Sequence, residues 1–172
     1  MNFHIGGFWR QGEGPRDAGY NANSGGQIKA NFTKKFDKGF VRLYFKHLND
    51  RSIGYLPMPV QVTGSNSSPV LGNVNNFNAL TVTPHSPYLM TNLSMGADGN
   101  LRRSSLQEGM NPISTAIGSE FNFFLGNDWS IVNKFRQQFN TGRFVSPFPS
   151  EVTDAQSMAN SIGGDNSVLS YA

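Results

Sequence analysis

The sequence has no cysteine and few charged residues, and each shortage excludes a class of protein. Without cysteine there can be no disulfide framework and no thiolate metal site. Charged residues make up 15% of the 172 residues, against about 25% in a typical globular chain. The formal net charge is only +3, whereas a disordered polyelectrolyte needs a high one. No Lys/Arg run is longer than two, so nucleic acid is not an expected partner.

Long apolar runs are also missing, which excludes an ordinary membrane-spanning helix of about 18 residues or more. What the sequence does have is Gly, Asn, Ser and Thr in quantity, with 19 Gly and 9 Pro, together with 14 Phe. Gly, Asn and Pro are poor helix formers. We therefore predict an all-β protein with long polar loops, rich in aromatic residues.

Strict alternation of apolar and polar residues predicts the strands. In 40–48, for example, Val41, Leu43 and Phe45 share one parity, and Arg42, Tyr44 and Lys46 share the other. Short turns at Asp37-Lys38-Gly39 and Gly126-Asn127-Asp128 join two pairs of segments into antiparallel hairpins. The alternation slips near Asn133 and Gln137. The predicted strands are 3–10, 26–36, 40–48, 116–125 and 129–139, in an antiparallel up-and-down sheet.

The other connections are long, at 49–115 and 140–172. We expect a small hairpin around Met95 within the first of them. In the second we expect a short loop helix near 152–162, where Thr153-Asp154-Ala155-Gln156 resembles a capping box.

Two interpretations fit this pattern: an outer-membrane β-barrel, and a soluble antiparallel sheet with one wet face, such as an adhesin or appendage domain. Short turns at one end and long loops at the other favour the barrel. Its apolar parity would face lipid and its polar parity the lumen. Phe36, Phe40, Phe124 and Trp129, next to the short turns, would supply one aromatic girdle.

An ordered set of short motifs resembles the barrel of TonB-dependent outer-membrane receptors. The set runs from Gly14-Pro15-Arg16-Asp17-Ala18-Gly19-Tyr20 through Val41-Arg42-Leu43-Tyr44 and His85-Ser86-Pro87-Tyr88 to Gly142-Arg143-Phe144-Val145-Ser146-Pro147-Phe148-Pro149. It also includes 23–31 and Tyr55-Leu56-Pro57. The resemblance implies a 22-stranded barrel in the bacterial outer membrane, containing a plug, driven by the TonB energy complex and importing a nutrient such as a ferric chelate or an oligosaccharide.

About five strands are readable in the sequence, which are too few to close such a barrel. The sequence shows no plug and no signal peptide either. We therefore expect residues 1–172 to be one partial barrel domain. Its partners would then be outer-membrane lipid, the plug, the remaining strands of a parent chain and, through the plug, the TonB complex.

Candidate site residues fall into two sets, and neither suggests an enzyme. The histidines, His4, His47 and His85, are far apart and lack metal-ligand spacing, so we predict no metal, no cofactor and no catalytic residues. The expected lumen-facing residues are Lys29, Arg42, Lys46, Glu120, Lys134 and Arg136. The candidate ligand contacts, chosen as aromatic, His and Arg residues of the long loops, are Tyr20, Tyr55, His85, Tyr88, Arg102, Arg103 and Arg143.

Overall fold

The structure is a computed structural model that describes residues 1–74 and 77–170. Strands account for 58% of the described residues and helix for 7%, which confirms the all-β prediction. None of the helices in these two ranges is long and apolar enough to cross a membrane. The chain divides into two compact units, 1–55 with 80–147, and 56–79 with 148–172.

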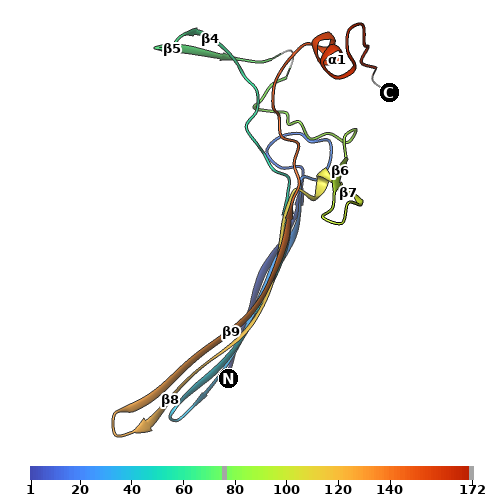
Figure 1. The fold of residues 1–172 in the computed structure, drawn as a ribbon. Coiled ribbons are helices and arrows are strands. Elements are labelled where there is room, and N and C mark those ends of the chain that lie inside the picture. The colour runs from blue at the N-terminus through green and yellow to red at the C-terminus, as the bar shows by residue number, and fades with distance from the viewer. Residues whose placement is uncertain (75–76, 171–172) are drawn as a thin grey trace. The chain divides into compact units, whose positions relative to one another are not determined.

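The first unit is built on a five-stranded antiparallel sheet in the order β1-β2-β3-β8-β9 (Figure 1). Each sheet strand pairs with the one before it, so the predicted up-and-down arrangement is confirmed. The strand order leaves β1 and β9 at the two edges, each paired on one side only. The strands are Asn2–Gly12 (β1), Asn23–Phe36 (β2), Gly39–Ser52 (β3), Met110–Gly126 (β8) and Trp129–Phe144 (β9).

The strands are longer than predicted, mainly at the end away from the tight turns. β3 runs to Ser52 instead of residue 48, and β8 begins at Met110 instead of residue 116. The prediction ended each strand where the apolar alternation ends. Backbone pairing needs no apolar side chain, so the ladder continues through polar residues.

Both tight turns lie at the same end of this sheet, as the up-and-down order requires (Figure 1). Phe124 N donates to Lys38 O at 2.7 Å, which joins β8 to the β2–β3 turn. Asn127 and Asp128 have φ of 50° and 62°, the left-handed conformation that a two-residue hairpin turn favours. Although the apolar alternation of the sequence breaks near Asn133 and Gln137, the pairing does not shift there: β9 keeps one register with β8 from Met110 to Phe124, and the register shifts only between Phe124 and Gly126.

At the opposite end, the loops of this unit form a small core of Ala18, Ala22 and Ile53. The predicted hairpin around Met95 is present as β6 (Thr91–Met95) and β7 (Leu101–Ser105). A turn of 3₁₀ helix at Leu106–Glu108 leads into β8.

The second unit contains a hairpin of β4 (Gln61–Ser65) and β5 (Ser68–Gly72), and the helix α1 (Ala155–Gly163). The hairpin was not predicted, because Pro69 argued against a strand there. The helix confirms the expected loop helix. Its N-cap is Asp154, whose carboxylate accepts from Ser157 N at 2.8 Å, so the cap lies one residue later than the expected capping box.

Candidate functional site

The register of the five-stranded sheet separates its side chains into two faces of opposite character. Residues that pair across strands share a face, and successive residues alternate between faces. Leu43, for example, pairs with Phe32 on β2, and Phe32 pairs with Phe3 on β1. We call this side the apolar face; its apolar members are Phe3, Ile5, Trp9, Ile28, Ala30, Phe32, Phe36, Val41, Leu43, Phe45, Ile113, Ile117, Phe121, Phe123, Ile131, Phe135 and Phe139.

The apolar face is not covered by any other layer of its unit. Phe3 is 76% exposed, Trp9 75% and Leu43 54%. The core cluster lies in the loops and contains no residue of this face. A soluble sheet hides its apolar side against a second layer of helix or strand. An apolar surface of this size left open is a contact surface for something else.

The height of the apolar face matches the hydrocarbon part of an outer membrane. Along β2 it runs from Phe36 at the turns to Gly26, about ten residues, or about 33 Å at about 3.3 Å per residue. Strands tilted by about 35–45° reduce this to about 23–27 Å, close to the band of about 25 Å seen in outer-membrane barrels.

Between Gly26 and the loop end of the sheet, the side chains on the side of the apolar face are polar in every strand. We call these residues the polar rim. Ser24 pairs with Gln11 and Arg51, and Asn111 pairs with Arg143.

The expected girdle beside the turns is only partly on the apolar face. Phe36 lies there, 6.0 Å from Phe123 between ring centroids. Phe40 pairs with Lys35, and Phe124 with Ser130, which places both on the other side of the sheet. The prediction grouped these aromatics by distance from the turn and did not apply the parity that separates them.

The opposite side, which we call the polar face, carries all six residues expected to face a lumen. Glu120 lies between two cations there, 3.4 Å from Arg42 and 3.5 Å from Lys134. Nearer the loops, Arg10 contacts Asp50 at 2.8 Å. These ion pairs are partly exposed, so each contributes little to stability on its own. The six residues are Lys29, Arg42, Lys46, Glu120, Lys134 and Arg136.

The charge differs sharply between the two sides of the sheet. On the polar face the basic side chains far outnumber the carboxylates, Asp50 and Glu120. The apolar face and its rim have no carboxylate on any of the five strands. The basic strand residues of the polar face are Arg10, Lys29, Lys35, Arg42, Lys46, Lys134 and Arg136, and those of the other side are Lys34, Arg51 and Arg143.

On each face of the sheet an aromatic ring packs over a glycine of the neighbouring strand. Neither contact was predicted from the sequence. On the polar face Tyr44 crosses Gly118 and donates its hydroxyl to Phe135 O at 2.9 Å. A β-carbon at Gly118 would overlap the Tyr44 ring. On the apolar face Trp9 lies against Gly26 in the same way. Such pairs restore the packing that a strand glycine loses.

Three of the candidate ligand residues come together in the loop core of the first unit. Tyr20 and Tyr55 pack against the core cluster. His85 is only 3% exposed; its Nδ1 lies 3.1 Å from the Tyr20 hydroxyl and its Nε2 3.2 Å from Gly54 O. Because a carbonyl only accepts, Nε2 carries the proton and Nδ1 accepts from Tyr20.

The loop core favours neutral side chains. Burial lowers the pKa of His85 below its ordinary value, although the bond to Gly54 O opposes the shift. Burial also raises the pKa of the Tyr20 and Tyr55 hydroxyls. The three side chains hold the segments around residues 20, 54 and 85 together, and their contact with a ligand stays a prediction.

The other four candidates do not join this cluster. Tyr88 is 86% exposed. Arg102 pairs with Asp98 across the β6–β7 turn, and Arg103 faces Leu93 in the same hairpin. Arg143 pairs with Glu108.

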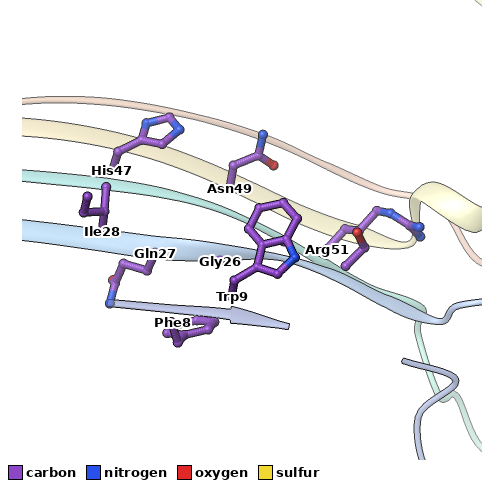
Figure 2. Close-up of a pocket in the computed structure, with 10 residues that line it drawn as sticks. Phe8, Trp9, Gly26, Gln27, Ile28, His47, Asn49 and Arg51 are labelled. Atoms are coloured by element: carbon purple, nitrogen blue, oxygen red, sulfur yellow. The ribbon is translucent and has the colours of Figure 1, made fainter. Parts of the chain in front are cut away.

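A groove that the sequence did not reveal opens where the apolar face meets the polar rim. It has a volume of about 420 Å³ and is lined by residues of β1, β2 and β3 (Figure 2). Figure 2 shows Trp9, His47 and Asn49 on one side of the sheet and Phe8 and Gln27 on the other. Arg51, at the loop end of the groove, was missed because β3 was expected to end at residue 48.

Within residues 1–74 and 77–170, no group of three or more His, Asp or Glu side chains could hold a metal ion. Comparison with protein-family models, with curated proteins and with solved structures found no match to this chain.

Proposed function

We propose that this chain is part of the β-barrel of a bacterial outer-membrane receptor of the TonB-dependent kind, which imports a nutrient. The observation that carries the proposal is the five-stranded sheet with an uncovered apolar face, a polar opposite face and both tight turns at one end. The motifs described above, in their order along the chain, support the receptor family.

In this proposal the two faces have different partners. The apolar face contacts outer-membrane lipid, and the polar face lines a lumen filled by a plug. The excess of Lys and Arg on the polar face would pair with acidic residues of that plug or attract anionic ligands. The remaining strands of the barrel pair with the open edges of β1 and β9, and the plug connects the receptor to the TonB complex.

The proposal assigns the recognition of ligand to the loop end of the sheet. Tyr88 and Arg103, both exposed there, are the candidates whose side chains can reach a ligand without disturbing the loop core. The imported molecule is expected to be a ferric chelate or an oligosaccharide. Nothing in this assignment calls for catalysis, a metal or a cofactor.

Cysteine labelling on intact cells that produce the chain tests the topology. The described chain has no cysteine to interfere. A cysteine at Ser94, in the β6–β7 hairpin, should react with an impermeant maleimide. A cysteine at Asn127, in the β8–β9 turn, should react only after the cells are permeabilised. The reverse pattern would overturn the proposed topology.

Solubility tests the proposal against a soluble β-module. A sheet with an open apolar face and two open edges aggregates in water, so the expressed chain should need detergent. A monodisperse, detergent-free monomer with a cooperative melt would contradict the membrane assignment.

Loss of uptake tests the transport activity itself. Deleting the coding region in the producing bacterium should abolish energy-dependent uptake of one ferric chelate or oligosaccharide, and restoring the gene should restore that uptake. Unchanged uptake of every such nutrient would contradict the transport role.

A further inference from the structure

We propose that the polar face carries a binding site for a small oxyanion with several negative charges, held by Lys29, Lys46 and Arg136. The chemical class is a polycarboxylate or a phosphate compound. The inference rests on the proposed function, since a site on this face meets an imported molecule only if the face lines a lumen. It goes further by requiring that molecule to be anionic and by placing its contacts on the strands instead of the loops.

Both carboxylates of the polar face are already taken by other cations. Glu120 lies between Arg42 and Lys134. Asp50 contacts Arg10 at 2.8 Å. The three cations of the proposed site have no ion pair within residues 1–74 and 77–170. Their charge is therefore not compensated by the sheet itself.

Two of these cations face each other directly across neighbouring strands. Lys29 on β2 pairs with Lys46 on β3. Like charges directly opposite each other in a sheet repel and destabilise it. An anion that contacts both ammonium groups removes this repulsion, so its binding relieves a cost that the sheet alone carries.

The lysine pair lies between two small residues. The row of paired residues that contains the lysines continues to Gly6 on β1 and to Ala116 on β8. Because neither of these has a long side chain, a hollow of about 370 Å³ opens beside the lysines. Its volume is within the range of sites for small molecules. The longer side chains that line it are His4, Lys29, Asn31, Tyr44, Lys46 and Arg136.

Arg136 reaches the hollow from the next row towards the turns. Its Nη2 donates to the side-chain oxygen of Gln138, which lies in the lysine row, so this bond turns the guanidinium towards that row. Its Nε and Nη1 have no partner in the part of the chain that the structure describes. They remain to donate to an anion, and the guanidinium fork matches a carboxylate or a phosphate.

Neutral groups form the wall of the hollow on the side of the turns. The Tyr44 ring lies over Gly118 on β8. On β1 the His4 ring lies over Gly6, where an added β-carbon would come within 3.1 Å of it. Asn31 pairs with both His4 and Tyr44 and lies between them. The wall thus adds imidazole and amide donors and no carboxylate.

Charge complementarity selects an anion with several charges over a neutral molecule. The three cations come from three strands, β2, β3 and β9, and line one hollow without any carboxylate among the lining residues. A neutral sugar would leave the repulsion between the lysines in place. A compact polycarboxylate or phosphate compound can contact all three cations at once.

Titration calorimetry of the full chain tests the inference. The chain is refolded in a neutral maltoside detergent at low salt, since salt screens exposed charges. The probes are citrate, pyrophosphate and, as a neutral molecule of similar polarity, maltotriose. We expect citrate and pyrophosphate each to bind at a single site per chain and maltotriose to give no binding heat.

Substitutions identify the site. Lys29→Gln and Lys46→Gln should each weaken the binding of both anions by about tenfold, because each removes a charge-assisted hydrogen bond. The matched control is Lys35→Gln, which removes the same charge from the same face and strand. Lys35 lies about 20 Å from Lys29 along β2. Its substitution should change the affinity by less than about twofold.

The outcomes separate this inference from the proposed function. Trp129→Phe leaves Trp9, on the apolar face, as the one tryptophan in the chain. If vesicles of brominated phosphatidylcholine do not quench Trp9, the apolar face is not in lipid, and the proposed function fails together with the inference that rests on it.

If Trp9 is quenched, the calorimetry decides the site alone. Absence of anion binding, or equal weakening by Lys35→Gln and Lys46→Gln, would overturn the site and leave the proposed function standing. Binding of a tetraglutamate peptide but of neither small anion would assign the hollow to an acidic polypeptide and would also overturn the inference.

Discussion

Replacing Leu43 with lysine tests whether the apolar face lies in a bilayer. Leu43 pairs with Phe32, about one row from the middle of the apolar band. A lysine facing lipid near the bilayer midplane costs about 2–4 kcal/mol. At about 1.4 kcal/mol per factor of ten, the folding equilibrium would fall by at least about 25-fold. On a face in water the same substitution would cost less than about 0.5 kcal/mol.

Leu101 provides the matched control, because it is also a strand leucine and is 63% exposed, against 54% for Leu43. It belongs to the β6–β7 hairpin, which the proposal places outside the bilayer. The assay is urea unfolding of each variant in lipid vesicles, followed by tryptophan fluorescence. We expect Leu43→Lys to lose about 2–4 kcal/mol and Leu101→Lys to change little. Equal, small losses in both variants would refute the assignment of the apolar face to lipid.

Three further predictions concern packing, pH and a helix cap. Gly118→Ala should displace the Tyr44 ring and cost about 1–3 kcal/mol in the same unfolding assay, whereas Gly12→Ala, with open space around it, should cost less than about 0.5 kcal/mol. His85 has a lowered pKa in the folded state, so its contribution to loop stability is complete above about pH 6.5 and lost as the pH falls through the folded pKa; the protection factors of the loop amides, which are the exchange rates corrected for their intrinsic pH dependence, should therefore fall on acidification, and His85→Gln should remove that fall. Asp154→Ala should destabilise α1 by about 1 kcal/mol, measured as lost helical circular dichroism.

One outcome would contradict each of these three predictions. Equal stability of the two glycine variants would show that the Tyr44 ring is not confined by Gly118. A loop whose exchange has the same pH dependence with and without His85 would assign that dependence to another group. An unchanged helical signal in Asp154→Ala would show that the cap does not limit α1.

The strands and their two faces could be predicted because each depends on neighbours within one segment. The parity of Val41, Leu43 and Phe45 already separates the faces of β3, and the register of the sheet brings these residues to the same side as Phe32 and Ile117. The turn chemistry at 126–128 likewise depends on adjacent residues. The up-and-down order then follows from short turns and antiparallel pairing.

The groove and the loop core could not be predicted, because they depend on contacts between distant residues. The Tyr20–His85 bond joins residues 65 positions apart. Arg51 was taken as a loop residue, since no apolar alternation marks the end of β3. Only the pairing of β3 with β2 shows that Arg51 lies on the same side of the sheet as Trp9 and Ile28, nearer the loops.

Nitroxide scanning of β3 tests the central claim most directly. Single cysteines at positions 41 to 46 are spin-labelled in the chain reconstituted in vesicles, and collision with oxygen and with a water-soluble nickel chelate is measured at each position. We predict a period of two: labels at Val41, Leu43 and Phe45 collide with oxygen, and labels at Arg42, Tyr44 and Lys46 collide with nickel. Nickel access at every position, with no alternation, would contradict a sheet that has one face in lipid.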